Sequence, residues 1–233
     1  MKNFKTKLII IFMFFIFFGT AQTALSPKLF YYSNKEKNLE KYENNYINLT
    51  KSLIEEVDLY MKEYGKGTRL NAELLVRLSD LYNIDLKLVL AQAHLESHFG
   101  TRGSATRTNS VFNVGTYDDG TFLYKYKHHN YSIEPYMKLL VENYLVDKNT
   151  NELLENNKFI NTEGSRYASD KMYERSLQEI IKKINEDTSI DSILKIRKFT
   201  IDIVESLQND DEIKKLKLKD CKICDELFLA NKL

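Results

Sequence analysis

The chain contains no tryptophan, two cysteines, two prolines and eight glycines in 233 residues. Proline and glycine interrupt helices, so their scarcity beside many leucines, isoleucines, lysines and glutamates indicates a mainly helical protein. Charge of one sign is also missing, because 34 basic and 33 acidic residues leave a formal net charge of +1. This balance removes the electrostatic argument for a nucleic-acid partner, and we expect none.

The two cysteines, Cys221 and Cys224, form one C-x-x-C pair near the end of the chain. Outside a reducing compartment such a pair is a local disulfide, a redox pair or half of a metal site. A zinc site would need two further ligands, and all four histidines lie far upstream. A redox pair usually sits at a strand-to-helix junction, whereas this one follows a lysine-rich segment. We predict a small disulfide clip or two free thiols, and no cofactor or metal.

Long apolar runs are also lacking, since the run at residues 8–18 is about half of what a membrane-spanning helix needs. Three lysines precede it, and the small residues Gly19 and Ala21 follow it. This order is typical of a secretory signal peptide, here 1–21 with cleavage before Gln22. We therefore expect an exported protein of the periplasm, cell envelope or extracellular space, with no integral membrane span in the mature chain. A retained N-terminal anchor is the alternative.

The remaining chain is long enough for one domain with extensions. We predict a linker or arm over 22–52, a helical domain over 53–187 and a helical extension over 188–233. Apolar periodicity predicts helices over 53–64, 71–82, 86–98, 133–146 and 172–184. Between them, Asp119-Gly120 is a hairpin-turn signal flanked by strand-forming residues at 116–117 and 121–124. The predicted fold class is mainly α (α+β), with a small β-hairpin lobe.

The most informative residue is Glu96, near the end of an expected helix that is otherwise apolar on nearly every side. A low-dielectric surround disfavours the ionised carboxylate, and proteins accept that cost mostly where a proton must be held near neutral pH. At about 100° per residue Glu96 faces the packed side, with Val89, Gln92 and Ala93 one turn below it. The alternative is a glutamate paired with a lysine or arginine, or one that lies at the rim of the protein.

A second interpretation of the same helix is a zinc site, because His94 and His98 are four residues apart. In the zinc-protease motif a glutamate directly follows the first histidine. Here that residue is Leu95, and Glu96 points away from the sector that the histidines share. We therefore predict no zinc chemistry.

Four sequence blocks follow one another at residues 84–101, 108–115, 131–140 and 166–173. The first contains A-Q-A-H-L-E-S-H-F-G, the second reads T-N-S-V-F-N-V-G, the third begins Y-S-I-E-P-Y and the fourth contains Y-A-S-D-K-M-Y. In this order they resemble the motifs of bacterial peptidoglycan glucosaminidases of the flagellar-hydrolase and autolysin type, which have a lysozyme-like fold. The resemblance covers roughly residues 68–185. The E-S-x-x-G piece is shared with lytic transglycosylases.

The resemblance implies an endo-β-N-acetylglucosaminidase that cleaves the glycan strands of peptidoglycan. It implies that Glu96 is the general acid and that Tyr167 is an active-site tyrosine facing it. It further implies a sugar groove whose substrate-binding residues are Asn109, Phe112, Asn113 and Tyr173. Each position also has a structural interpretation, with Phe112 in the core, Asn109 in a cap or turn and Tyr167 at a helix start.

The sequence departs from the family pattern in two places. Asn113 replaces the usual glycine of an F-G-I block, which leaves the backbone path there open. The second carboxylate is also open: we name Asp118 as the catalytic candidate and Asp119 as its neighbour, although aspartate is common in tight turns. Glu134 is a third candidate, with a helix-start role as its alternative.

Several functions remain open at this point. Two carboxylates permit acid–base hydrolysis. One carboxylate suffices if a group of the substrate attacks the anomeric carbon. The attacking group is the acetamido group in a substrate-assisted hydrolase and the 6-hydroxyl group in a lytic transglycosylase. A non-catalytic glycan-binding or envelope-assembly protein and a wall-drilling component of a phage or secretion machine are further alternatives. The sequence does not fix the oligomeric state, and we expect a monomer.

Overall fold

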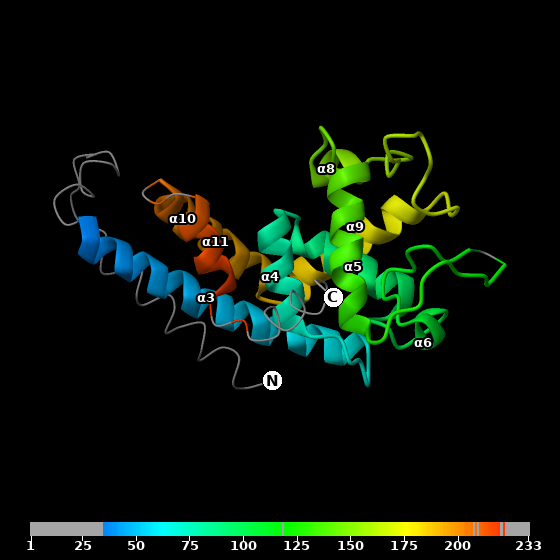
Figure 1. Cartoon of the computed structure of the whole chain (residues 1–233), viewed down its shortest axis with the longest axis horizontal. Helices are drawn as coiled ribbons and strands as arrows, with labels where there is room; N and C mark the ends of the chain where they lie inside the picture. Colours follow the sequence, from blue (N-terminus) through cyan, green and yellow to red (C-terminus); the bar gives the residue numbers. More distant parts are fainter. Residues whose placement is uncertain (1–34, 118, 207, 209, 220, 222–233) are drawn as a thin grey trace. The chain divides into compact units, whose positions relative to one another are not determined.

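The computed structural model describes residues 35–117, 119–206, 208, 210–219 and 221 (Figure 1). The chain divides after Glu40 into two units, and the account below concerns the second, Lys41–Leu233. The longer helices are α3 (Lys35–Tyr64), α4 (Ala72–Tyr82), α5 (Leu86–Ser97), α9 (Tyr173–Asp187), α10 (Ile190–Glu205) and α11 (Asp210–Leu218). The short ones are α6 (Ala105–Thr108), the 3-10 helix η1 (His129–Ser132), α7 (Ile133–Leu139), the π-helix η2 (Leu140–Tyr144) and α8 (Thr150–Leu153).

Helix α5 lies inside the core, packed between α4 and α9. A helix that is apolar all round has to be buried, and the buried positions of α5 include Leu88, Val89, Leu90 and Ala91. The Asp85 side chain caps its first turn by accepting a hydrogen bond from the backbone N–H of Lys87 at 2.9 Å. The predicted helical class is therefore confirmed, and no helix in the described residues is long and apolar enough to cross a bilayer.

The expected helices over 71–82, 133–146 and 172–184 are confirmed as α4, as α7 continued by η2, and as α9. Within the segment 22–52, predicted as a linker or arm, the chain is helical from Lys35 onward, because α3 begins there. Its packed stripe continues upstream through Tyr46 and Thr50, which are buried. Tyrosine and threonine carry polar atoms, so a search for apolar periodicity misses them. The boundaries of the predicted domains remain predictions, and the proposed signal peptide lies outside the described residues.

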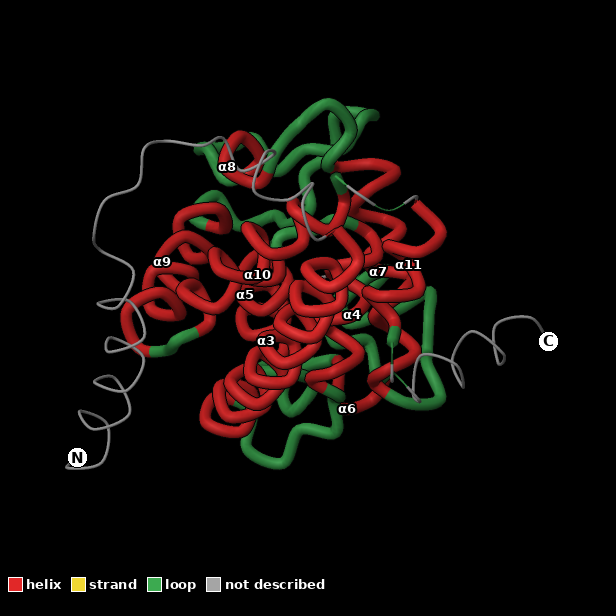
Figure 2. The backbone as a smooth tube through the Cα atoms, turned by 90° about the vertical axis from the view of Figure 1, so that its left-hand side faces the viewer, coloured by secondary structure: helices red, strands yellow, loops and turns green. Residues whose placement is uncertain are grey.

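The predicted β-hairpin lobe is not shown. Across 116–122 the described residues form one isolated antiparallel bridge, Thr116 with Phe122, closed by a hydrogen bond from Tyr117 N to Thr121 O at 2.9 Å. The described chain is drawn as helices and loops only (Figure 2). A two-stranded ribbon is stable only when it buries one face, and here Tyr117 and Leu123 are exposed instead.

The expected C-terminal extension packs on the helical domain. Helix α10 contacts α9, and α11 contacts α4. At the centre of this contact the guanidinium of Arg197, only 3% exposed, donates to Tyr46 Oη at 2.8 Å, to Thr50 Oγ1 at 3.1 Å and to the carboxylate of Asp80. Cys221 is buried and disulfide-bonded, in keeping with the predicted clip, while Cys224 lies outside the described residues.

We predict that Arg197→Ala lowers the free energy of unfolding by about 3 kcal/mol, because it leaves the Asp80 carboxylate without its cation in a partly buried place. Urea denaturation measures the change. The matched control on the same helix is Lys198→Ala, whose exposed pair with Asp202 should contribute less than about 1 kcal/mol. Equal losses in the two variants would contradict a structural role for the Arg197 network.

Candidate active site

A pocket of about 540 Å³ opens at the C-terminal end of α5. Its walls come from Glu96, from the loop 113–117, from Leu139 and Tyr144, and from the loop 166–169. This volume is in the usual range for small-molecule sites. Glu96 is the only carboxylate among the described residues that line the pocket. Any acid–base chemistry that these residues perform therefore centres on Glu96.

Neutral donors hold both carboxylate oxygens of Glu96. The hydroxyl of Tyr173 donates to Oε1 at 2.7 Å, and the side-chain amide of Asn113 donates to Oε2 at 3.0 Å. The same Asn113 amide also donates to the backbone oxygen of Glu96 at 2.8 Å. Burial raises the pKa of the Glu96 carboxyl above its ordinary value, and the two hydrogen bonds lower it in part. The group therefore keeps its proton to a higher pH than a solvated glutamate does.

Behind Glu96, a chain of hydrogen bonds runs through the core, and every group in it donates toward Glu96. When the carboxylate is ionised it only accepts, so in that state Tyr173 donates its single hydrogen to Oε1. Tyr173 then accepts from Gln92 Nε2 at 2.9 Å, and Gln92 Oε1 accepts from the hydroxyl of Tyr136. Gln92, Tyr136 and Tyr173 are all buried. Because each donor is committed to one acceptor, the chain fixes Tyr173 as a donor to Oε1.

The turn after α5 connects Glu96 to the loop that forms the pocket wall. Ser97 Oγ donates to Val111 O at 2.6 Å and accepts from the backbone N–H of Gly100 at 2.8 Å. Gly100 has φ +84°, and a Cβ there would lie 2.7 Å from the ring of His129. Both the backbone angle and the space require glycine. The E-S-x-x-G pattern thus carries one pocket residue and two residues that position its wall.

Asn113 keeps the backbone path that a glycine would take. Its φ is +51°, in the left-handed region that glycine favours and that asparagine tolerates better than most residues. The open question about this substitution is therefore answered. The change also supplies the amide that bonds to Glu96, which a glycine has no atoms to provide.

The pocket wall formed by the loop 166–169 is held by a partly buried ion pair. Arg166 lies 2.9 Å from the carboxylate of Glu174, whose side chain is 2% exposed. This pair anchors the loop that carries Tyr167, whose hydroxyl donates to Phe112 O at 2.7 Å. The rings of Tyr167 and Tyr173 stack with centroids 5.7 Å apart. The wall is therefore tied both to α9 and to the loop across the pocket.

Comparison with protein families gives one match, over residues 72–186, to the glucosaminidase family, described as mannosyl-glycoprotein endo-beta-N-acetylglucosaminidase. This domain belongs to the glucosaminidase family. The family comprises lysozyme-like peptidoglycan hydrolases, so the domain is that of a glycoside hydrolase acting on peptidoglycan glycan. Comparisons with curated proteins and with solved structures give no match.

The glucosaminidase domain brings Asn113, Tyr167 and Tyr173 together around Glu96, although Tyr173 lies behind the carboxylate rather than in the pocket lining. It does not bring the other two predicted sugar-binding residues there. Asn109 donates to Tyr126 O at 2.7 Å and accepts from Arg69 at 3.1 Å.

Phe112 is fully buried, with its ring stacked 3.6 Å from that of Tyr136. Phe112 is therefore part of the hydrophobic core, which was the alternative to a sugar-binding role at this position. Phe112 reaches the opposite wall through its backbone oxygen alone, where Tyr167 donates.

The candidates for a second carboxylate have different outcomes. Asp118 lies outside the described residues. Asp119 is exposed, and its carboxylate accepts from Thr121 N at 2.9 Å and from Thr121 Oγ1 at 2.7 Å, which lowers its pKa. Glu134 accepts from Tyr82 and pairs with Lys138 on its own helix. Asp119 and Glu134 thus have structural partners and do not line the pocket of the glucosaminidase domain.

Sequence reasoning gave no role to Gln92, Tyr136 or Tyr144 in the site. Gln92 was visible, since it is a polar residue four positions before Glu96 in an apolar helix, which places both on one face. Tyr136 and Tyr144 left no such signal. Their positions depend on how α7 and η2 pack against α5.

His94 lies on α5 and His98 is the C-cap of that helix; both are half-buried, and their ring centroids are 5.0 Å apart. His94 is packed among the rings of Tyr60, Tyr64 and Phe99, and its Nδ1 lies 3.0 Å from the hydroxyl of Tyr60. Burial lowers the pKa of His94 to about 4, so this ring is neutral near pH 7.

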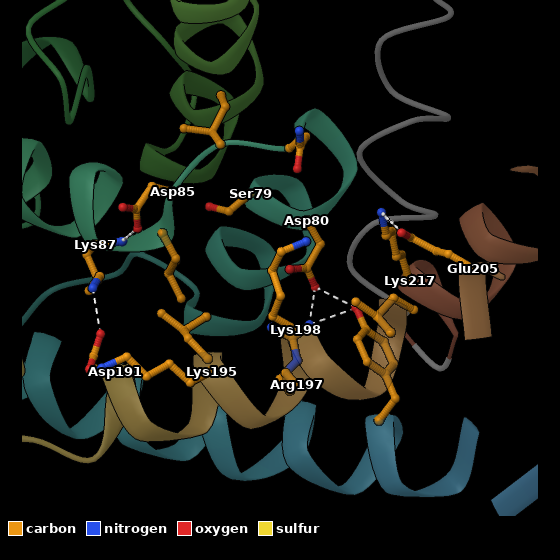
Figure 3. A pocket seen from close by; sticks show the side chains of 16 residues that line it. Ser79, Asp80, Asp85, Lys87, Asp191, Lys195, Arg197, Lys198, Glu205 and Lys217 are labelled. Carbon is orange, nitrogen blue, oxygen red and sulfur yellow. Dashed lines mark hydrogen bonds and ion pairs between the residues drawn. The ribbon is translucent and has the colours of Figure 1, made fainter. Parts of the chain in front are cut away.

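A larger cavity of about 760 Å³ lies between α4, α5, α10 and α11 (Figure 3). Its charged side chains pair with one another: Lys87 and Lys195 reach the same carboxylate, Asp191, at 2.6 and 2.7 Å. The hydrogen bonds from Lys195 and Lys87 lower the pKa of Asp191, the opposite of the shift at Glu96. This cavity is lined by helix-joining ion pairs, so we place the candidate active site in the smaller pocket.

We predict that removing either donor raises the pKa of Glu96 further, because each hydrogen bond stabilises the charged form. The variants are Tyr173→Phe and Asn113→Gly, the second chosen because glycine fits the left-handed backbone. Carboxyl ¹³C NMR titration measures the shift. Tyr82→Phe, which removes a donor to Glu134 instead, should leave the Glu96 titration in place. An unchanged Glu96 pKa in both test variants would contradict the hydrogen-bond arrangement.

Proposed function

We propose that the glucosaminidase domain is an endo-β-N-acetylglucosaminidase that cleaves the glycan strand of peptidoglycan with Glu96 as general acid. One observation supports this most directly. Glu96 lines a polar pocket, is held by neutral donors, and has its pKa raised by burial. To protonate the oxygen of a leaving sugar, an enzyme needs a carboxyl group that keeps its proton and lies beside an open cleft.

In the proposed step, Glu96 gives its proton to the glycosidic oxygen while the bond from that oxygen to the anomeric carbon breaks. The bonding electrons leave with the oxygen, and positive charge develops on the sugar ring. Because Tyr173 donates to Oε1, the acidic proton is on Oε2, which is the oxygen on the Asn113 side. Tyr173 and Asn113 then stabilise the carboxylate that remains.

A second group must attack or activate water at the anomeric carbon. We propose Asp118, next to the pocket-lining Tyr117, as the base for a water molecule. The competing route uses the carbonyl oxygen of the substrate's own acetamido group and needs no second carboxylate. The first route inverts the anomeric configuration and the second retains it, so proton NMR of the initial product separates them.

We further propose that Tyr167 forms the wall facing Glu96, as the family resemblance implies, and that the protein is exported to the cell envelope. Export suits a peptidoglycan substrate, which lies outside the cytoplasmic membrane. A monomer is sufficient for this proposal, because all the residues named in it come from one chain.

We predict that the purified protein releases soluble fragments from peptidoglycan sacculi with N-acetylglucosamine at the reducing end. Mass spectrometry of borohydride-reduced products identifies that end. Anhydro-muramic ends would instead identify a lytic transglycosylase. Fragment release should fall by about 100-fold or more in Glu96→Gln, since general acid catalysis contributes at least that factor.

The control for this assay is Glu142→Gln, an exposed glutamate outside the pocket. Glycan binding should persist in Glu96→Gln, because the amide keeps the shape of the side chain. A wild-type protein that binds sacculi yet releases nothing would favour the non-catalytic glycan-binding alternative.

We predict that activity is lost as pH rises through the pKa of Glu96, because the acid must be protonated before the bond breaks. Since burial raises that pKa, the alkaline limb of the kcat/KM profile should lie above the ordinary range of a glutamate. Asn113→Gly should move this limb to higher pH, because a donor to the carboxylate is lost. A limb that moves to lower pH would rule out Glu96 as the titrating acid.

A further inference from the structure

Exposed aromatic side chains are concentrated beside the pocket. Tyr117, Phe122 and Tyr124 are 52%, 41% and 51% exposed, and within the described part of the chain Phe199 is the only other exposed aromatic. All three lie on the loop that follows α6 and extends from the helices in Figure 1. An exposed apolar cluster has a cost in water, so its concentration in eight residues indicates a binding surface.

Contacts within the loop connect the three rings to the lining of the pocket that contains Glu96. Tyr117 itself lines the pocket that contains Glu96. Phe122 forms the bridge with Thr116. Residues directly opposite each other in such a bridge have their side chains on the same face. The Phe122 side chain therefore lies on the same face as that of Thr116, another residue that lines the pocket.

Tyr124 is held against a third pocket-lining residue. A Cβ on Gly115 would lie 2.7 Å from its ring, and Leu123 N donates to Gly115 O at 2.8 Å. Gly115 has φ +68°, so glycine fits both the backbone angle and the close approach of the ring.

We propose that Tyr117, Phe122 and Tyr124 form an aromatic ledge that binds the glycan strand outside the catalytic pocket. The inference rests on the proposed function, because the pocket must hold a sugar for the strand to continue over the ledge. A glycan strand is a polymer, so sugars on at least one side of the cleaved bond lie beyond a pocket of about 540 Å³.

The chemistry of the ledge suits sugars. Each pyranose ring has a face of C–H groups that carry partial positive charge, and an aromatic face carries partial negative charge. The hydroxyls of Tyr117 and Tyr124 add polar groups that suit the hydroxyl edges of sugars. Continuity with the pocket favours the glycan over a protein partner, since Tyr117 lines the same pocket as Glu96.

The test measures how affinity depends on glycan length. The inactive Glu96→Gln protein is titrated by calorimetry with β-1,4-linked N-acetylglucosamine oligomers of increasing length, which carry no peptide. The ledge variant adds Tyr117→Ala and Phe122→Ala to it. Affinity of the parent should rise with length, and the ledge variant should lose about threefold to tenfold per removed ring on long oligomers. Tyr124→Ala is assayed separately, because its ring also packs on Gly115.

The control is Phe199→Ala, a still more exposed aromatic (65%) on α10 that does not line the pocket. It should leave the length dependence unchanged, and thermal unfolding verifies that all variants fold. A ledge variant with the length dependence of its parent overturns the ledge alone. A parent that binds neither oligomers nor sacculi overturns the proposed function with it. A parent that self-associates only while the ledge is intact, without glycan dependence, assigns these rings to a protein contact and overturns the proposal.

Discussion

The hydrogen-bond chain from Tyr136 through Gln92 and Tyr173 to Glu96 is the constraint around which this site is arranged. Its direction follows from the Gln92 amide, whose nitrogen donates to Tyr173 while its oxygen accepts from Tyr136. Inside a low-dielectric core each bond is stronger than in water, and an unpaired member would be costly. The core therefore sets the orientation of Glu96 and leaves its second oxygen to the amide of Asn113, a residue that lines the pocket. Burial raises the pKa of the carboxyl more than the two neutral donors lower it, whereas a cation at the same distance would lower it further.

The motif residues around Glu96 divide into those that face the pocket and those that position its walls. Ser97 and Gly100 connect the end of α5 to the loop that follows it, and neither has a place in the proposed proton transfer. Asn113 combines both roles, because a left-handed backbone turns the loop while the amide reaches the carboxylate. The exposed rings beyond that loop extend the same surface. The segment 96–124 thus carries the proposed acid Glu96, its hydrogen-bond donor Asn113 and the aromatic ledge proposed to bind the rest of the glycan strand.

Much of this arrangement could be read from the sequence. The apolar helix around Glu96, its Asp85 cap and the helices that became α4 and α9 follow from local preferences, which depend on neighbouring residues alone. The early start of α3 was missed because Tyr46 and Thr50 belong to its packed face through contacts with Arg197, far along the chain. The turn and strand residues at 116–124 predicted a hairpin, but the described residues there form only the isolated bridge between Thr116 and Phe122. Tyr117 and Leu123 beside this bridge are exposed, so the segment does not bury a face.

By itself the sequence determined that Glu96 lies on the packed side of a buried helix, because helical periodicity and burial are local properties of 86–98. It also determined the family, through motifs in a fixed order. Only the tertiary structure decided which groups meet that carboxylate. Tyr173 and Asn113 reach it from two separate segments, and Tyr167 stacks on Tyr173. Asn109 and Phe112 turn to other partners. Contacts between segments far apart in sequence depend on the packing of whole helices, and no local pattern encodes them.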